Sequence, residues 1–85
     1  MKNEILQNLI KLTQLEEIAD RTEADYEREP ENTEYEETFD RAYKNEFDLY
    51  KRIARQLSAL AGISENTARK LIKTKRVELI SILSA

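Results

Sequence analysis

The chain contains neither cysteine nor histidine, and only one glycine and one proline among its 85 residues. Without cysteine it cannot form a disulfide framework, a thiolate zinc site or a cysteine nucleophile. Without histidine it lacks the usual general base at neutral pH and the commonest metal ligand. Gly62 alone cannot form a phosphate-binding loop, because such loops need several glycines. These absences predict a binding protein that is not an enzyme and that carries no cofactor or metal ion.

Long apolar runs are also missing from the sequence. No stretch approaches the roughly 18 apolar residues that a membrane-spanning helix needs. Polar residues interrupt the N-terminal segment, so it does not resemble a signal peptide. We therefore expect a cytoplasmic protein that makes no use of a membrane.

The residues that are present favour long amphipathic helices. Charged residues make up 36% of the chain and hydrophobic residues 40%, which with so little glycine and proline is unlike a sandwich or barrel. The length indicates a single helical domain spanning residues 1–85. Because so small a core is marginal, we expect a partner subunit, in the form of a homodimer.

Charge is divided unequally along the chain. Residues 16–48 hold fourteen acidic and four basic side chains, a net charge of −10. Residues 49–85 hold eight basic and two acidic side chains, a net charge of +6. The overall charge of −3 hides this asymmetry, which is the most informative global feature of the sequence.

Apolar residues recur at helical spacing in three segments, which predicts a small antiparallel three-helix bundle. Seven aliphatic residues between positions 5 and 18 are more than one narrow stripe requires, and a patch of this kind usually marks an interface. They add to the case for a dimer. The predicted helices cover about residues 3–28, 33–61 and 64–83.

The expected helix ends depend on residues with defined backbone preferences. Pro30 should end the first helix, because proline disfavours the helical conformation in the residue before it. Thr33 and Glu36 match a capping box at the start of the second helix. Gly62 should end that helix in the left-handed conformation, and Ser64 should cap the third helix.

The segment IARQLSALAGISENTARKLIKTKR, residues 53–76, resembles the helix-turn-helix of bacterial DNA-binding proteins. In that family the glycine at the position of Gly62 makes the turn, and the aliphatic residue at Ile63 packs into the core. The residue at Ser64 caps the recognition helix, and the small residue at Ala68 lets the two helices cross closely.

The resemblance implies roles for five polar residues of the third helix. Asn66, Arg69 and Lys70 would face base edges, and Lys73 and Arg76 would contact phosphates. The protein would then be a nucleic-acid-binding accessory or regulatory protein of transcription in bacteria, with duplex DNA as its partner.

An ordinary helical hairpin, with its turn chosen for packing, is the alternative interpretation of this segment. The chain has Ser58 where the family usually has alanine, four residues before the glycine. No break is predicted within residues 33–61, whereas a helix-turn-helix begins with a short helix.

All six aromatic residues lie between positions 26 and 50, within the acidic part of the chain. Tyrosines at helical spacing are usually core residues with their hydroxyl at the rim, and we rank that interpretation first. The alternative is a protein-binding face, in an adaptor, an inhibitor or a mimic of DNA charge. Its residues would be Tyr35, Glu36, Phe39 and Tyr43.

The acidic stretch of residues 25–36 has carboxylates at several ligand positions of a twelve-residue calcium loop. Its sixth position, which needs glycine for a sharp turn, is Pro30. We therefore predict a solvated acidic turn with no metal site.

Overall fold

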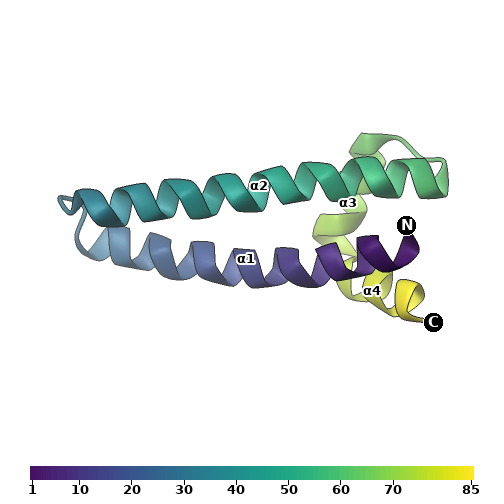
Figure 1. Ribbon diagram of the computed structural model, residues 1–85, viewed down its shortest axis with the longest axis horizontal. Helices are drawn as coiled ribbons and strands as arrows, with labels where there is room; N and C mark the ends of the chain where they lie inside the picture. The colour runs from purple at the N-terminus through teal and green to yellow at the C-terminus, as the bar shows by residue number, and fades with distance from the viewer.

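A computed structural model describes residues 1–85, and four helices account for nearly all of them (Figure 1). The prediction of an all-helical chain is confirmed. The helices are α1 (Lys2–Arg28), α2 (Thr33–Ala61), α3 (Glu65–Thr74) and α4 (Arg76–Ser84).

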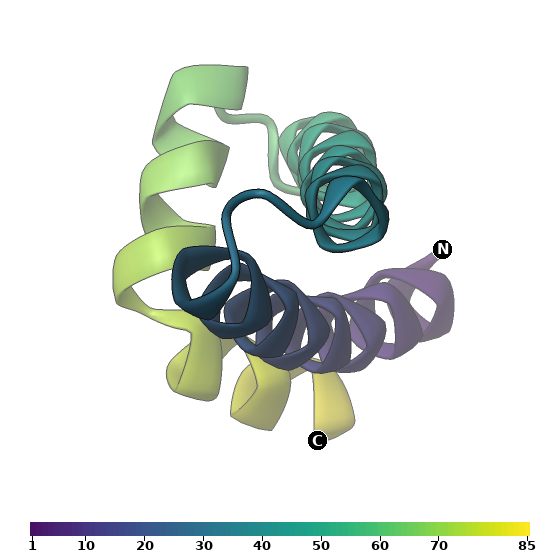
Figure 2. The ribbon, with the colours of Figure 1, turned by 90° about the vertical axis from the view of Figure 1, so that its left-hand side faces the viewer.

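The long helices α1 and α2 form an antiparallel hairpin, and the two short helices lie at the end of it that is remote from the connecting loop (Figure 1). Viewed along the hairpin, α3 crosses beside α2, and α4 runs beneath α1 (Figure 2). The molecule is therefore elongated, with dimensions of 46 × 22 × 19 Å.

The prediction of a single helix over residues 64–83 is wrong, because the chain bends at Lys75 and forms two helices. The side chain of Arg76 explains the bend. Its Nε donates a hydrogen bond of 3.1 Å to the carbonyl of Ile72, the acceptor that a continuous helix would offer to the amide of residue 76. The bend directs α4 under α1, where Leu83 is buried. Four helices therefore replace the expected three.

The start of α2 differs from the predicted capping box. Asn32, not Thr33, is the N-cap residue, and its side-chain oxygen accepts a hydrogen bond of 3.0 Å from the amide of Glu34. Asparagine is as good a cap as any residue, because its short side chain reaches the exposed amides of the first turn. Thr33 is consequently the first helical residue.

The core lies where all four helices meet. Ten buried side chains form one cluster there, drawn from every helix, whereas none of residues 20–41 is buried. The loop half of the hairpin is thus held by partly buried aromatic rings. The ring centres of Tyr26 and Phe39 lie 5.9 Å apart, and those of Phe39 and Tyr43 lie 6.3 Å apart. The core cluster comprises Ile5, Leu9, Leu12, Leu49, Ile53, Ala54, Leu57, Ala68, Ile72 and Leu83.

Replacing Gly62 should test the turn between α2 and α3. Gly62 has φ +67, and a β-carbon there would meet no atom within 4 Å. A Gly62→Ala variant should therefore suffer backbone strain alone, and lose about 1 kcal/mol of unfolding free energy. Urea unfolding followed by circular dichroism measures the loss. Gly62→Asn should lose less, because asparagine tolerates the left-handed region. An alanine variant as stable as the parent would contradict the expectation.

Candidate nucleic-acid interface

Hydrogen bonds hold both ends of the turn that joins α2 to α3. The Gly62 amide donates to the Ser58 carbonyl at 3.0 Å, and the Ser58 hydroxyl donates to the Ile63 carbonyl. The Ser64 hydroxyl accepts a hydrogen bond of 3.1 Å from the amide of Thr67, so the predicted cap of α3 is confirmed. Ser58, the residue that departs from the helix-turn-helix pattern, thus ties the turn to α2. This bonding sets the direction in which α3 leaves.

A small residue lies where α3 crosses α2. Ala68 and Ile72 are completely buried on the inner side of α3, and Ile63 packs against the core from the turn. The absence of a large side chain at Ala68 lets the two backbones approach each other. Inward packing of these residues leaves the polar side of α3 facing outward.

Four of the five residues expected to contact DNA line one groove beside α3, of about 370 Å³. The other two lining residues, Phe47 and Tyr50, come from α2. We call this space the outer groove. It is lined by Phe47, Tyr50, Asn66, Arg69, Lys70 and Lys73.

The lining residues of α3 differ in their exposure. Asn66, Lys70 and Lys73 are exposed, as the sequence predicted. Arg69 is half-buried, so less of its side chain is open to a ligand than of the other three. Its Nε is buried and has no hydrogen-bond partner, whereas its carbonyl accepts a bond of 3.1 Å from the hydroxyl of Tyr50. Burial raises the pKa of Tyr50, which keeps this hydroxyl protonated and able to donate.

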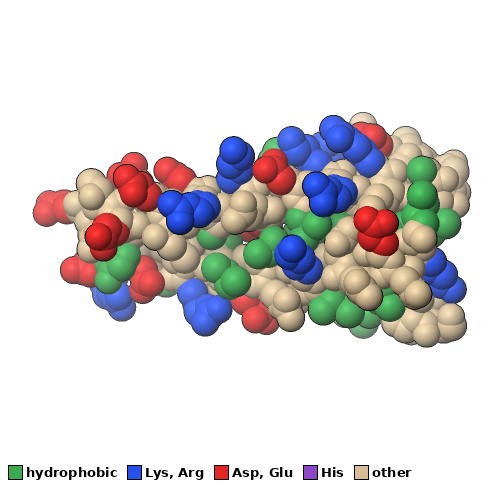
Figure 3. All heavy atoms as spheres, viewed as in Figure 1, with side chains coloured by type: hydrophobic (Ala, Val, Ile, Leu, Met, Phe, Trp, Pro, Cys, Tyr) green, Lys and Arg blue, Asp and Glu red, His purple; other side chains and the backbone are tan.

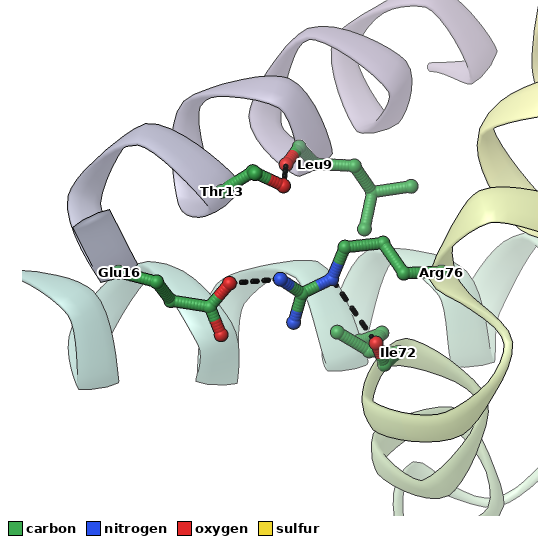
Figure 4. Close-up of polar contacts among 5 residues, drawn as sticks. All are labelled: Leu9, Thr13, Glu16, Ile72 and Arg76. Carbon is green, nitrogen blue, oxygen red and sulfur yellow. Dashed lines mark hydrogen bonds and ion pairs between the residues drawn. The ribbon is translucent and has the colours of Figure 1, made fainter.

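Arg76, the fifth expected DNA contact, lies outside the outer groove. Its guanidinium lies between Glu16 of α1, with which it forms an ion pair, and the Ile72 carbonyl of α3 (Figure 4). The side chain is only 18% exposed. Arg76 therefore links α1 to the α3–α4 bend, a role that the sequence pattern did not reveal.

A smaller space of about 160 Å³ adjoins the outer groove and shares Phe47, Tyr50 and Lys73 with it. We call it the inner pocket. Tyr43, which the sequence assigned to a separate protein-binding face, lies here. The structure thus joins part of the aromatic face to the basic helix. The inner pocket is lined by Leu12, Glu16, Tyr43, Glu46, Phe47, Tyr50, Lys73 and Arg76.

The core interpretation that we ranked first holds for Tyr50, which packs against the core cluster, but not for the aromatic residues as a set. None of them is buried, and Tyr43 and Phe47 are 58% and 45% exposed. Of the other residues expected on a protein-binding face, Glu36 is exposed, and Tyr35 and Phe39 are half-buried.

Two lysines lie over aromatic rings that line the outer groove. Lys51 Nζ is 4.9 Å from the ring centre of Phe47, and Lys73 Nζ is 5.5 Å from that of Tyr50. Both distances are within the range of cation–π attraction. In the sequence Phe47 and Tyr50 stand out only as two of the six clustered aromatic residues. The spacing of four residues between Phe47 and Lys51 was an available sign of a site, whereas nothing local in the sequence pairs Tyr50 with Lys73.

Acidic side chains gather at one end of the molecule. On the face that Figure 3 shows, acidic side chains crowd the end formed by the α1–α2 loop, and α3 lies toward the opposite end. The stretch considered for calcium lies at this acidic end. It covers the last turn of α1, the loop and the first turn of α2, with Asp25 paired to Arg28 at 3.0 Å.

A further acidic residue lines the inner pocket. Burial raises the pKa of Glu46, and the nearby carboxylates of Glu16 and Asp20 raise it further, whereas Arg76 lowers it. Ionised Glu46 therefore lies in an unfavourable environment at neutral pH.

Removing the charge of Glu46 should stabilise the protein in a pH-dependent way. Because the folded-state pKa is raised, ionisation of Glu46 destabilises the fold as the pH rises through the carboxyl range. Glu46→Gln should raise the thermal midpoint at neutral pH, and the gain should shrink as acidification protonates Glu46 in the parent. Thermal unfolding across pH measures it, with Glu37→Gln as an exposed control. A gain that grew in acid would contradict this account.

Comparisons with known proteins identify no relative of the chain. No protein-family model, curated protein or solved structure matches the chain. None of the four helices combines the length and the hydropathy that a membrane span requires. The case for a function therefore depends on the surface between α2 and α3.

Proposed function

We propose that the protein is a non-enzymatic binding protein that holds nucleic acid against α3 and the adjoining side of α2. The observation that carries the proposal is the gathering of Arg69, Lys70 and Lys73 along one groove with Asn66. Phosphate contacts from lysine and arginine supply most of the affinity of such proteins. Acidic side chains crowd the loop end and would repel a polyanion there, whereas the basic residues of this groove would attract one.

The turn before α3 supports duplex DNA as one form of the ligand, and with it a regulatory role in transcription. A left-handed Gly62, the Ser64 cap and the buried Ala68 match the turn of a helix-turn-helix, whose second helix lies in the major groove. Asn66, Arg69 and Lys70 would then face base edges.

The acidic residue at the start of α3 opposes phosphate binding there, but a basic residue lies near it. Glu65 Oε1 is 3.9 Å from Arg55 Nε, and both side chains are at least half exposed. The pair is weak, as exposed ion pairs are. We leave Arg76 out of the proposed phosphate contacts because its guanidinium is engaged with Glu16.

Protein binding through the acidic, tyrosine-rich face is the alternative function. The exposure of Tyr43, beside the half-buried Phe39, favours it, because tyrosine is enriched at the centre of protein interfaces. Glu36 and Tyr35 extend the same face toward the loop. A protein partner would then bind the acidic part of the chain, and the basic side of α3 would be merely solvated.

Neutralising Lys70 and Lys73 together tests the nucleic-acid proposal. In the Lys70→Gln, Lys73→Gln variant, log affinity should fall less steeply with the logarithm of salt concentration. The slope should be smaller in magnitude by roughly two, because each phosphate-contacting lysine contributes about one. Fluorescence anisotropy with a labelled duplex over a salt series measures the slope. The matched control is Lys11→Gln, Arg52→Gln, which removes the same charge from a separate groove between α1 and α2.

Equal loss of affinity in both double variants would show that the charge of the whole protein, and not the outer groove, attracts nucleic acid. If neither duplex nor single-stranded DNA binds at low salt, and a protein partner is retained by the parent but lost on Tyr43→Ala, the alternative function holds.

A homodimer belongs to the same proposal, and the exposed side of α4 supports it. Val77 and Ile82 are 78% and 65% exposed, and Ile10 of α1 is 46% exposed. Figure 3 shows apolar side chains gathered along α1 and α4 at the end of the molecule that is remote from the α1–α2 loop. A helix that is apolar on most sides is normally covered. A second copy would cover this surface and enlarge a small core.

Charge placed on α4 should dissociate the proposed dimer. The parent should sediment as a dimer at micromolar concentration, and Ile82→Lys or Val77→Lys should sediment as a monomer, because a lysine cannot be buried unpaired in the interface. Leu60→Lys, at an exposed apolar position on α2, which does not contact α4, should remain a dimer. A monomeric parent would contradict the proposal.

A further inference from the structure

The junction of the outer groove and the inner pocket carries exposed aromatic rings that duplex binding would not use. Tyr43 and Phe47 project from α2, one helical turn apart, and more than two fifths of each side chain is exposed. Base pairs in a duplex stack on one another, so their faces cannot stack on a protein ring. Rings beside cations are instead the usual platform for unpaired bases.

Charge divides this surface into two unlike parts. The outer groove holds Arg69, Lys70 and Lys73 and no acidic residue. The inner pocket holds two acidic residues, Glu16 and Glu46, and two basic ones, Lys73 and Arg76, so its charges balance. A phosphate is therefore attracted to the outer groove more than to the inner pocket, whose rings and balanced charge suit an uncharged planar group.

The side chain of Arg69 points to an oxyanion in the outer groove. Its Nε has no acceptor within the protein, although a buried N–H without an acceptor is costly. A phosphate bound side-on to a guanidinium accepts from two of its nitrogens. Such a ligand could satisfy the Nε of Arg69 with a small shift of the side chain.

We propose that the surface between α2 and α3 binds single-stranded nucleic acid. Phosphates lie against Arg69, Lys70 and Lys73, and a base enters the inner pocket to stack on Phe47 or Tyr43. The pocket, of about 160 Å³, is on the scale of one base. This inference rests on the proposed function and deepens it, because it names unpaired strands as the preferred form.

Three labelled DNA probes of equal length test the inference by fluorescence anisotropy at low salt. They are a mixed-sequence single strand, its duplex, and an abasic single strand that keeps the phosphates but has no bases. The intact strand should bind about tenfold more tightly than the abasic strand, since each stacked base adds to affinity. It should also bind more tightly than the duplex.

Substitution of the rings isolates the stacking. Phe47→Ala and Tyr43→Ala should bring the intact strand toward the affinity of the abasic strand, without changing the abasic strand's own affinity. Phe47→Tyr, which keeps a ring, should retain the parent preference. Leu60→Ala is the matched control, because Leu60 lies on the same helix and is 45% exposed, as Phe47 is. Circular dichroism establishes that each variant is folded.

The outcomes separate this inference from the function on which it rests. If the abasic strand or the duplex binds as tightly as the intact strand, stacking is overturned and nucleic-acid binding stands. If Leu60→Ala removes the preference as Phe47→Ala does, the proposed base site is wrong. If none of the three probes binds, the proposed function fails and this inference fails with it.

Discussion

The close crossing of α3 over α2 at Ala68 is the contact on which the rest of the structure depends. Ala68 has no exposed surface, and the turn that delivers it is held by Gly62, Ser58 and Ser64. With the inner side of α3 buried, its basic side has to face outward beside the rings of α2. The outer groove is therefore a consequence of packing, and its charge comes from residues that the core cannot accept.

The bend at Lys75 is the second constraint, and it closes the core. A straight helix from residue 64 to residue 83 would have carried Leu83 away from α1. Because the bend turns α4 under α1, the N-terminal half of α1 is covered on two sides. Arg76 connects this bend to Glu16, so a residue that looks like a phosphate contact in the sequence serves the fold instead.

The elongated shape places many acidic side chains near the loop and leaves apolar surface uncovered at the opposite end. The hairpin extends beyond the short helices, so residues 20–41 around its loop include no buried residue and concentrate acidic side chains. The other end combines basic residues with exposed apolar ones, such as Val77 and Ile82. A small domain with this distribution can gain stability by covering the apolar side of α4 and can attract a polyanion to the basic side of α3.

The sequence by itself determined the helical class, the extents of α1 and α2, and the stop at Gly62, because these follow from local periodicity and backbone preference. It also identified Asn66, Arg69, Lys70 and Lys73 as neighbours, since helical spacing brings them to one side. Only the tertiary structure decided that Phe47 and Tyr50 line the same groove and that Arg76 does not. Those contacts join residues distant in sequence, and periodicity carries no information about which helix faces meet.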